Sequence, residues 1–507
     1  MYYNEIAVCK ALCDMFFVTL SRNNSSMKKE RIIASEETIN ILISNAKKAI
    51  ADSECLLHDI ELIKVEICNN ELQGNYLQLV LELLSGSLLG ICEVYSNLKD
   101  MLSSSNTYVK RYHMQMINLS QYEWCIYLSG KDQNGVLANL IQYLNEQHYN
   151  SLELENVLEK VRLLGIKCNV GLRSMTAHYD EPNIMYKKLL TLNDEDVYVR
   201  RIGEQLLIHD MILKYVSPIL QMIKGGLYHI DKEGIRKKGF EFNIQNILNA
   251  KVAEAFNNKE ELEIVISHQI ANAWDDIESL KRLFDTCEKI IEFLKSRQID
   301  YNRLIEMRSL VEMQLAVSFM RYDLICSMDS YLNAQSNTER SICFMYVYRI
   351  ETAALTHLYG YNEERRQNSI WDRIKAIPEY KSTPLSNDIE RNLKILTSHF
   401  DGTRRNLYTH YREGSKLNIS DRWHCANKMD HPKELMQILQ LVTLCKNIHQ
   451  YLASLLSVMN TTEKKKNDEI LEPIRNIKEI AYKNNLQDIV KMSDKLLSIF
   501  SLSNVKL

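Results

Sequence analysis

The chain has 507 residues, of which 46% are hydrophobic and 25% charged, and its formal net charge is −3. This length is enough for roughly two or three domains with a sizeable core, and the small net charge excludes a protein that coats nucleic acid through a general basic excess. Only 6 prolines and 15 glycines interrupt the sequence. Sheet proteins need many tight turns, so this scarcity predicts long helices and an all-α fold.

The first apolar segments predict core helices and no targeting or membrane segment. Charged residues interrupt the apolar run at the start of the chain (Glu5, Lys10 and Asp14), which argues against a signal peptide. The longest apolar window, "YLQLVLELLSGSLLGICEVY", contains Glu82 and Glu93, so it predicts a buried helix and not a membrane span. The 12 cysteines show no zinc-ligand spacing. We therefore expect a cytoplasmic protein with reduced thiols.

An apolar stripe at helical spacing predicts an amphipathic helix before residue 170. Its members are Leu154, Val157, Leu158, Val161 and Leu164. The stretch that follows, "LRSMTAHYDE", contains Arg173, then four residues, then His178 and Tyr179. Residues 173–178 are termed motif 1 below.

The second half of the chain repeats this arrangement. An apolar stripe again predicts a helix, with Asn387 and Glu390 as a capping box at its start. Its members are Ile389, Leu393, Leu396 and Phe400. The stretch "RRNLYTHYRE" follows at residues 404–413, and its residues 405–410 are termed motif 2. Pro432 then predicts the first position of another helix, whose stripe is Leu435, Ile438, Leu439, Val442 and Ile448.

Pairs of landmarks recur in the same order with nearly constant separation, which indicates a duplicated helical domain. Gly130 and Gly360 lie 230 positions apart, the two motif arginines 232 apart, and the segments "YVSPIL" and "YLASLL" 236 apart. We therefore predict two related helical bundles, residues 1–250 and 251–507, packed as a pseudo-dimer with one motif in each.

Basic runs are the sequence's candidates for a local phosphate-binding surface. They are Arg200–Arg201, Arg236–Lys238, Arg404–Arg405 and Lys464–Lys466. Runs of this kind are most often solvated faces of helices, and we interpret them in that way.

Motif 2, Arg405-Asn406-Leu407-Tyr408-Thr409-His410, resembles the RNxxxH motif of HEPN domains. These domains are helical bundles found in many ribonucleases of prokaryotic defence and toxin systems. Motif 1, Arg173-Ser174-Met175-Thr176-Ala177-His178, is similar to the looser form of that motif, with serine in place of asparagine. The resemblance rests on the motif residues, because the surrounding helices are generic. It implies tandem HEPN-like domains.

The resemblance also implies metal-independent cleavage of RNA, in which the 2′-hydroxyl of the substrate attacks the neighbouring phosphate. His178 and His410 would act as base and acid, in an order that the sequence leaves open, because imidazole titrates near neutral pH. Arg173 and Arg405 would bind the phosphate and stabilise its developing charge. Two such domains usually pair with both motifs in one groove, so the chain would build a composite site that needs no cofactor and no metal.

Further residues would support this site. Asn406 shares a helix face with His410, and Ser174 shares one with His178, so we expect both to orient a histidine or the phosphate. Arg404 adds charge beside Arg405. Tyr179 and Tyr411 either stack on a base or pack, and packing is favoured. The cluster "RWHCANKMDH" (residues 422–431) lacks the spacing of a tetrahedral metal site, so packing is favoured there too.

The expected partners are RNA, with tRNA or mRNA as target, and a regulatory protein such as an antitoxin. The resemblance implies a role in antiviral defence or in a toxin–antitoxin system, without membrane contact. The sequence leaves open whether the chain forms a homo-oligomer. The competing interpretation is a noncatalytic HEPN-like module that binds a partner protein or a nucleotide. Motifs that share one groove would favour the nuclease, whereas motifs buried apart would favour the module.

Overall fold

The computed structural model describes residues 33, 35–69, 75–130, 135–168, 179, 181–227, 259–296, 298, 301–360, 368–398, 431–461 and 467–502. Every regular element in this part of the chain is an α-helix, and it contains no strand. The all-α prediction is therefore confirmed. The sequence also allows a short hairpin or an irregular connection at residues 226–243. Its first two residues end α9, and the rest lies outside the described residues.

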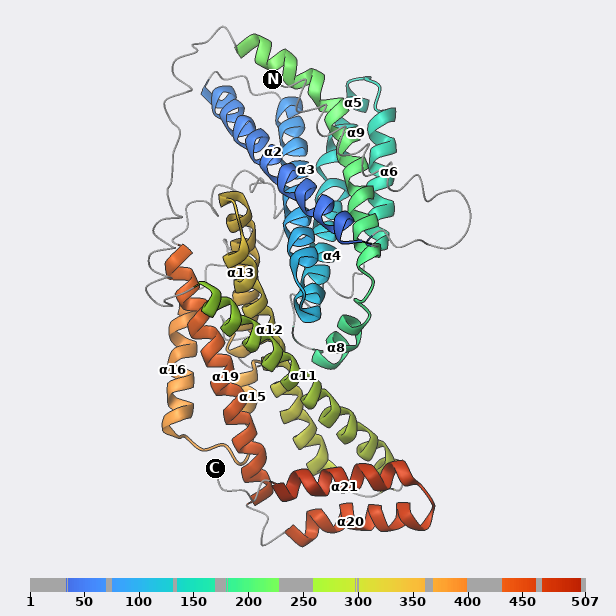
Figure 1. The fold of residues 1–507 in the computed structure, drawn as a ribbon, viewed down its shortest axis with the longest axis vertical. Helices are drawn as coiled ribbons and strands as arrows, with labels where there is room; N and C mark the ends of the chain where they lie inside the picture. The colour runs from blue at the N-terminus through green and yellow to red at the C-terminus, as the bar shows by residue number, and fades with distance from the viewer. Residues whose placement is uncertain are drawn as a thin grey trace.

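The helices of the first half form one bundle in the upper part of the molecule (Figure 1). They are α2 (Glu36–Asn69), α3 (Asn75–Ser103), α4 (Thr107–Ser129), α5 (Val136–Glu146), α6 (Leu152–Lys167), α8 (Pro182–Leu190) and α9 (Glu195–Leu227). Helix α3 is central, because α2, α4, α5 and α9 all pack against it, and α6 packs on α4 and α9.

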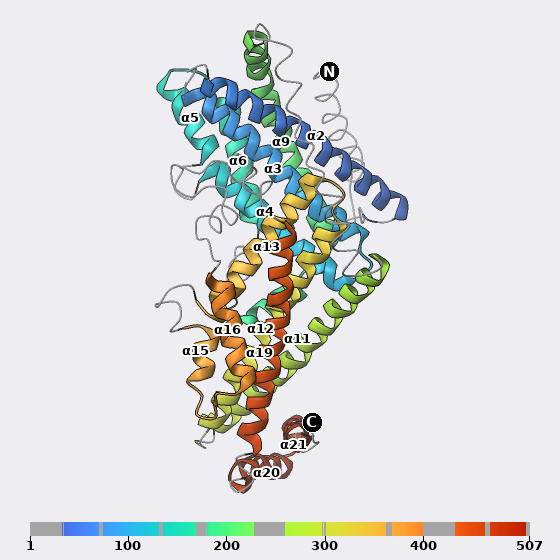
Figure 2. The same ribbon diagram turned by 90° about the vertical axis from the view of Figure 1, so that its left-hand side faces the viewer.

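The helices of the second half form the lower part of the molecule (Figures 1 and 2). They are α11 (Lys259–Ser296), α12 (Asn302–Asn333), α13 (Asn337–Leu358), α15 (Ile370–Lys375), α16 (Pro384–Ser398), α19 (His431–Thr461), α20 (Asn467–Lys483) and α21 (Gln487–Leu502). Helix α12 packs against α11, α13 and α19, and α16 packs on α19. The α20–α21 pair lies at the opposite end of the molecule from α5 (Figures 1 and 2).

The helices of the two halves begin at matching separations along the chain. Helix α13 begins 230 positions after α4, α16 begins 232 after α6, and α19 begins 236 after α9. These are the same three separations that the sequence landmarks have. Neighbours also correspond: the pairs α2–α3, α3–α4, α3–α9 and α6–α9 have the counterparts α11–α12, α12–α13, α12–α19 and α16–α19.

The glycine landmarks have a structural reason. Gly130 ends α4 with φ 74° and Gly360 follows α13 with φ 73°. Side chains with a β-carbon rarely adopt positive φ, whereas glycine does so at little cost. The Gly130 N–H donates to the Ile126 carbonyl at 2.7 Å, and the Gly360 N–H donates to the Leu355 carbonyl at 3.2 Å. Both glycines therefore terminate a helix with the same backbone requirement.

The helices predicted before the two motifs are present. All members of the first stripe are buried in α6, and Ile389, Leu393 and Leu396 are buried in α16. Phe400 lies outside the described residues. The third predicted helix is α19, in which Pro432 is the second residue. In its stripe, Leu435, Ile438 and Ile448 are buried. Leu439 and Val442 are partly buried.

The capping box predicted for α16 is wrong. The helix begins at Pro384, so Asn387 and Glu390 lie inside it. Thr383 Oγ1 accepts a hydrogen bond from the Ser386 N–H at 3.1 Å, and Ser386 Oγ accepts one from the Thr383 N–H at 2.8 Å. Threonine and serine thus form the reciprocal cap that we assigned one turn later. Proline, with its fixed φ, favours the first helical position and starts the helix earlier.

Most contacts between the two halves join helices that correspond to each other, namely α3 with α13, α4 with α12, α2 with α13 and α4 with α11. Helix α8 also packs against α12, a pair that has no counterpart among the described helices. If α2 is exchanged for α11, α3 for α12 and α4 for α13, the α3–α13 and α4–α12 pairs convert into each other, and so do the α2–α13 and α4–α11 pairs. Lys99 Nζ of α3 lies 2.8 Å from a Glu339 oxygen of α13, and Tyr322 of α12 donates to the Tyr108 carbonyl of α4 at 2.5 Å. The contact between the halves is therefore polar as well as apolar.

Helix α3 also answers the question of a membrane span. Within the described residues, Tyr76–Ser103 is long and apolar enough to cross a membrane by length and composition. However, 78% of the apolar window is buried inside the protein, as expected for a core helix. Glu93, which interrupts this window, is itself buried.

Candidate functional site

Most residues of the predicted site lie outside the described part of the chain. They are Arg173, Ser174, His178, Arg404, Arg405, Asn406, His410 and Tyr411. Tyr179 is described, as are the helices that precede the motifs, α6 and α16. The site can therefore be built from the residues that bound motif 1.

A buried polar cluster holds the chain where it enters motif 1. Cys168 follows α6 and is buried, and Arg201 of α9 donates to its sulfur at 3.5 Å. The same guanidinium donates through Nε and Nη2 to Gln121 Oε1 of α4 at 3.0 and 2.7 Å. A hydrogen bond from the Cys125 thiol lowers the pKa of Cys168. The prediction that the Arg200–Arg201 run is a solvated face is wrong for Arg201, because Gln121 offers its charge a buried acceptor.

The chain leaves motif 1 at Tyr179, which is bound by the second half. Its phenol donates to Asp323 Oδ2 of α12 at 2.9 Å. Its backbone N–H donates to His357 Nε2 of α13 at 3.1 Å. The two rings meet edge to face with centroids 5.8 Å apart. Tyr179 is 2% exposed, so it packs in the core and does not offer its ring to a base.

Asp323 is an acid in an apolar setting. Its residue is 1% exposed, and burial raises the pKa of its carboxyl to about 7, although the hydrogen bond from Tyr179 lowers it. Burial likewise raises the pKa of Tyr179, so the phenol keeps its proton and stays a donor. Within the described residues, Asp323 Oδ1 is buried without a hydrogen-bond partner. Tyr179 is therefore the partner that compensates for burying this group.

His357 lies in the last turn of α13, two residues before Tyr359, and is half-buried. Its Nε2 accepts the Tyr179 N–H, so this nitrogen carries no proton and the neutral ring is protonated at Nδ1. The His357 imidazole thus accepts a hydrogen bond from the backbone of Tyr179, the residue that follows motif 1.

The helix that follows motif 1 is also bound to the second half. Helix α8 packs against α12. Tyr186 of α8 stacks on Trp274 of α11 with centroids 6.0 Å apart, and Tyr108 of α4 stacks on the same indole at 5.0 Å. The Arg111 guanidinium lies 5.3 Å from the Trp274 ring centroid. At Tyr179 and again at Tyr186, the first half therefore contacts helices of the second half.

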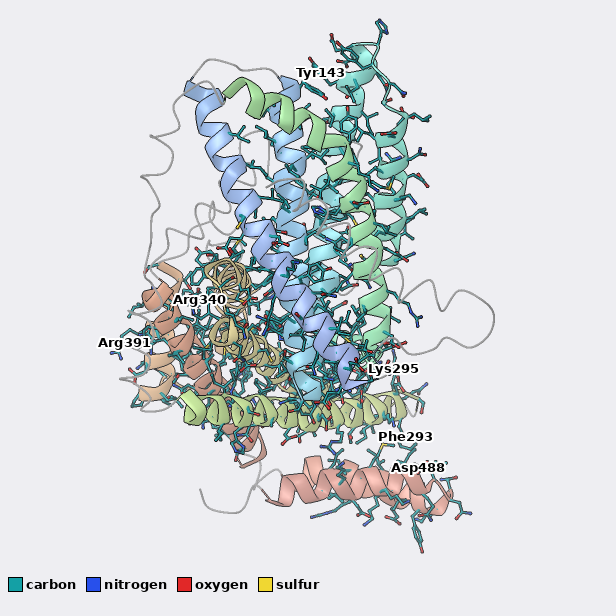
Figure 3. The ribbon with its side chains drawn as sticks, turned by 45° about the horizontal axis from the view of Figure 1, so that its top comes forward. Tyr143, Phe293, Lys295, Arg340, Arg391 and Asp488 are labelled. Carbon is teal, nitrogen blue, oxygen red and sulfur yellow. The ribbon has the colours of Figure 1, made fainter. Side chains whose placement is uncertain are left out.

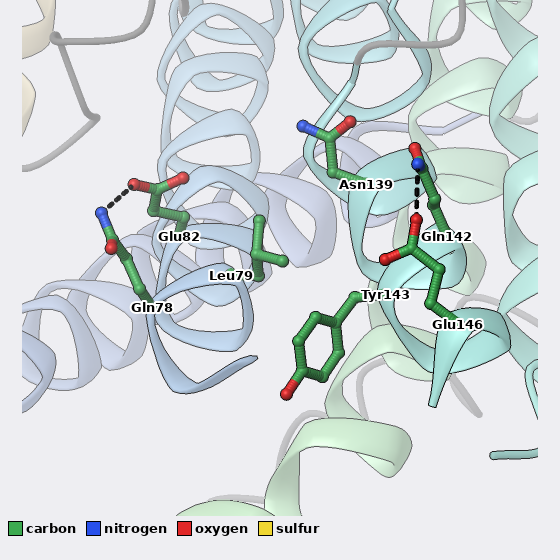
Figure 4. A pocket seen from close by; sticks show the side chains of 7 residues that line it. All are labelled: Gln78, Leu79, Glu82, Asn139, Gln142, Tyr143 and Glu146. Carbon is green, nitrogen blue, oxygen red and sulfur yellow. Dashed lines mark hydrogen bonds between the residues drawn. The ribbon is translucent and has the colours of Figure 1, made fainter. Parts of the chain in front are cut away.

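A pocket of about 350 Å³ lies on α3 and α5 (Figure 4). Its lining residues are Gln78, Leu79, Glu82, Asn139, Gln142, Tyr143 and Glu146. Gln78 and Gln142 donate to Glu82 and Glu146, at 3.3 and 2.8 Å. The lining contains two carboxylates and no basic side chain, so it is poorly suited to phosphate.

The described residues contain no group of three or more histidine, cysteine, aspartate or glutamate side chains that could hold a metal ion. Most of the cluster at residues 422–431 lies outside them. Most of the cysteines that the structure describes are buried.

Sequence reasoning missed Asp323 and His357, because neither belongs to a motif. One signal was available. Asp323 lies 230 positions after Glu93, the separation of the two glycine landmarks, and both acids interrupt strongly apolar segments. Both are 1% exposed in corresponding helices, α3 and α12. An acid that recurs at the separation of the landmarks was therefore a candidate for a specific contact.

Comparisons with family models, with curated proteins and with solved structures gave no match. The geometry defines an all-α protein whose first motif is entered from a polar cluster of the first half and is followed by a residue, Tyr179, that is bound by the second half. The functional argument rests on the chain's own residues.

Proposed function

We propose that the chain is a metal-independent endoribonuclease of HEPN type, with one composite site formed by motif 1 and motif 2. Its two halves, residues 1–250 and 251–507, would be tandem HEPN-like bundles paired as a pseudo-dimer. The matching helix separations and the exchangeable helix pairs at the contact between the halves support this architecture. A pair related by a twofold axis has such reciprocal contacts.

Tyr179 is the observation that carries the proposal. It is the covalent neighbour of His178, and both of its hydrogen-bond partners belong to the half that contains motif 2. A noncatalytic module in which each motif serves its own bundle gives no reason for this crossing. A site shared by both motifs explains why Tyr179 is bound by the other half, because each histidine must reach the same phosphate.

The chemistry follows from the residue types. One histidine would remove the proton of the 2′-hydroxyl, and the other would protonate the leaving 5′-oxygen. The products would be a 2′,3′-cyclic phosphate and a 5′-hydroxyl. Arg173 and Arg405 would stabilise the charge on the phosphorane, and Ser174, Asn406 and Arg404 would orient or support these groups.

The biological setting is proposed on the resemblance alone. It comprises a cytoplasmic ribonuclease acting on tRNA or mRNA in antiviral defence or in a toxin–antitoxin system, controlled by a partner protein. The net charge of −3 fits a substrate held at few phosphates.

The test is incubation of the purified chain with total RNA, with and without a chelator, beside the His410→Ala variant. We expect fragments ending in a 2′,3′-cyclic phosphate, equal amounts with chelator, and none from the variant. Cleavage that persists in His410→Ala, or that the chelator stops, would contradict the proposal. Binding of RNA without cleavage would favour the noncatalytic module.

A further inference from the structure

The contact between Tyr179 and the second half joins one residue to two helices. The phenol is fixed by Asp323 of α12 and the backbone N–H by His357 of α13, at 2.9 and 3.1 Å. A side-chain bond alone would let the backbone pivot about the tyrosine side chain. Because a second bond holds the main chain itself, the position and the direction of the chain at residue 179 are both defined.

We propose that Asp323 is a positioning residue for the composite site, acting through Tyr179 on His178. The inference rests on the proposed ribonuclease function. Adjacent α-carbons are about 3.8 Å apart across a trans peptide, so whatever fixes Tyr179 restricts its covalent neighbour His178. A displacement of about 1 Å at a reacting group can cost on the order of 10²-fold in rate. Asp323 thus links the geometry of the first motif to the core of the second half.

The chemistry of Asp323 favours positioning over packing. A buried carboxyl group costs free energy that an apolar side chain of similar size does not. Among the described residues its Oδ1 has no hydrogen-bond partner, and Tyr179, through Oδ2, is the partner that compensates this cost. A leucine would fill the space at lower cost but would give the phenol no acceptor. What the carboxyl adds is therefore a directional bond to Tyr179.

The experiment compares kcat and KM for a labelled RNA in Tyr179→Phe, Asp323→Leu and Asp323→Asn. We expect the first two to lower kcat about tenfold with KM unchanged within about twofold, because ground-state binding of RNA does not need the anchor. Asp323→Asn keeps an acceptor oxygen and should recover kcat to within about threefold of wild type. Tyr127→Phe is the matched control: this buried phenol donates to the Glu82 carbonyl at 3.0 Å within the first half.

A histidine NMR measurement separates failure of this inference from failure of the proposed function. The His178 resonance is assigned by its loss in His178→Ala, and it should shift in Tyr179→Phe and Asp323→Leu but not in Tyr127→Phe. If wild type does not cleave RNA, this shift still tests the anchor. An unmoved His178 resonance, or a normal kcat in Tyr179→Phe, overturns the inference. A variant that only unfolds at lower temperature, with normal kcat, shows a structural role alone.

Discussion

Helices α3 and α4 of the first half and α12 and α13 of the second share their backbone plan but not their polar contacts. In the first half His113 Nδ1 lies 3.1 Å from Asn97 Oδ1, and burial lowers the pKa of His113 to about 3. The positions 230 residues later are Cys343 and Ser327, and the Ser327 hydroxyl donates to the carbonyl of Leu324 in its own helix at 2.8 Å. The second half therefore has no counterpart of the His113–Asn97 pair at these positions.

The acids Glu93 and Asp323 behave differently from that pair. Both halves place a carboxyl at this position, and both bury it. Burying a carboxyl group costs free energy. We therefore expect a specific role for a carboxyl that is buried in both halves. Asp323 has such a role in binding Tyr179. The comparison teaches that the two halves share a helix plan and a buried acid at this position, whereas the His113–Asn97 pair is present in the first half alone.

The largest expected effects concern the motif arginines, which the comparison predicts to be equivalent. Arg405→Ala and Arg173→Ala should each lower kcat on the order of 10²-fold, because the developing charge on the phosphate loses its stabilising cation. The control is Arg391→Ala in α16, an exposed arginine that points outward (Figure 3) and whose side chain is 69% exposed. Its kcat should match wild type. A normal rate in Arg173→Ala would break the equivalence of the two motifs.

A smaller effect is expected at the acids. If the halves correspond, Glu93 should serve the residue that follows motif 2, Tyr411, as Asp323 serves Tyr179. Glu93→Leu should then lower kcat about as much as Asp323→Leu, roughly tenfold. Glu82→Leu, in the same helix but partly exposed, is the control. If Glu93→Leu keeps the wild-type kcat while Asp323→Leu does not, only motif 1 is anchored in this way.

The raised pKa of Asp323 predicts a pH dependence of stability. Its pKa is about 7 in the folded protein and about 4 in an unfolded chain. The folded state therefore binds more protons between these values. The carboxyl's contribution to the free energy of unfolding is fully present below about pH 4 and is lost as the pH rises through about 7.

Asparagine carries no charge at any of these pH values, so Asp323→Asn should gain stability relative to wild type between pH 5 and pH 8. Buried histidines oppose the trend, because burial lowers the pKa of His113 to about 3 and that of His209 to about 4. These histidines are present in wild type and in Asp323→Asn, so their contributions cancel in the difference in stability between the two. The measurement is Tm at both pH values, with substitution of an exposed residue of α21, Asp488→Asn, as the control (Figure 3). A difference in Tm that stays constant with pH would contradict the buried, protonated carboxyl.

The smallest predicted effect concerns the landmark glycines. Gly130 has φ 74° and ψ 155°, a region that is essentially restricted to glycine, and Gly360 has φ 73°. Gly130→Ala and Gly360→Ala should each lower the free energy of unfolding by about 1–3 kcal/mol in urea titrations. Gly165→Ala, inside α6, separates packing from backbone strain: alanine favours the helix, but the added β-carbon would lie 3.3 Å from Cys125 Cβ. Unequal costs at the two landmarks would weaken the correspondence between the halves.

The sequence predicted the helices well because burial repeats at the helical period. The stripe from Leu154 to Leu164 became the buried face of α6, and Gly130 and Gly360 end corresponding helices. Local chemistry was less decisive: Thr383 and Ser386 cap α16 in place of Asn387 and Glu390, because both pairs are plausible caps and Pro384 selects between them.

Contacts between distant residues could not be predicted in the same way. Nothing in the neighbourhood of Arg201 shows that Gln121, 80 residues away, accepts its charge. Likewise Tyr179 and Asp323 are 144 residues apart and neither sequence context names the other. The contacts of Tyr179 therefore follow from the fold and not from the motif beside it.

The central claim is that motif 1 and motif 2 form one site, and the most direct measurement is the cleavage rate of His178→Ala beside that of His410→Ala. Each histidine would perform one proton transfer on the same phosphate, so each variant should lose on the order of 10²-fold or more in kcat. The double variant should be little worse than either, because the two act as a unit. A wild-type rate in His178→Ala with no cleavage in His410→Ala would show that the first half is only a structural partner and would contradict the composite site.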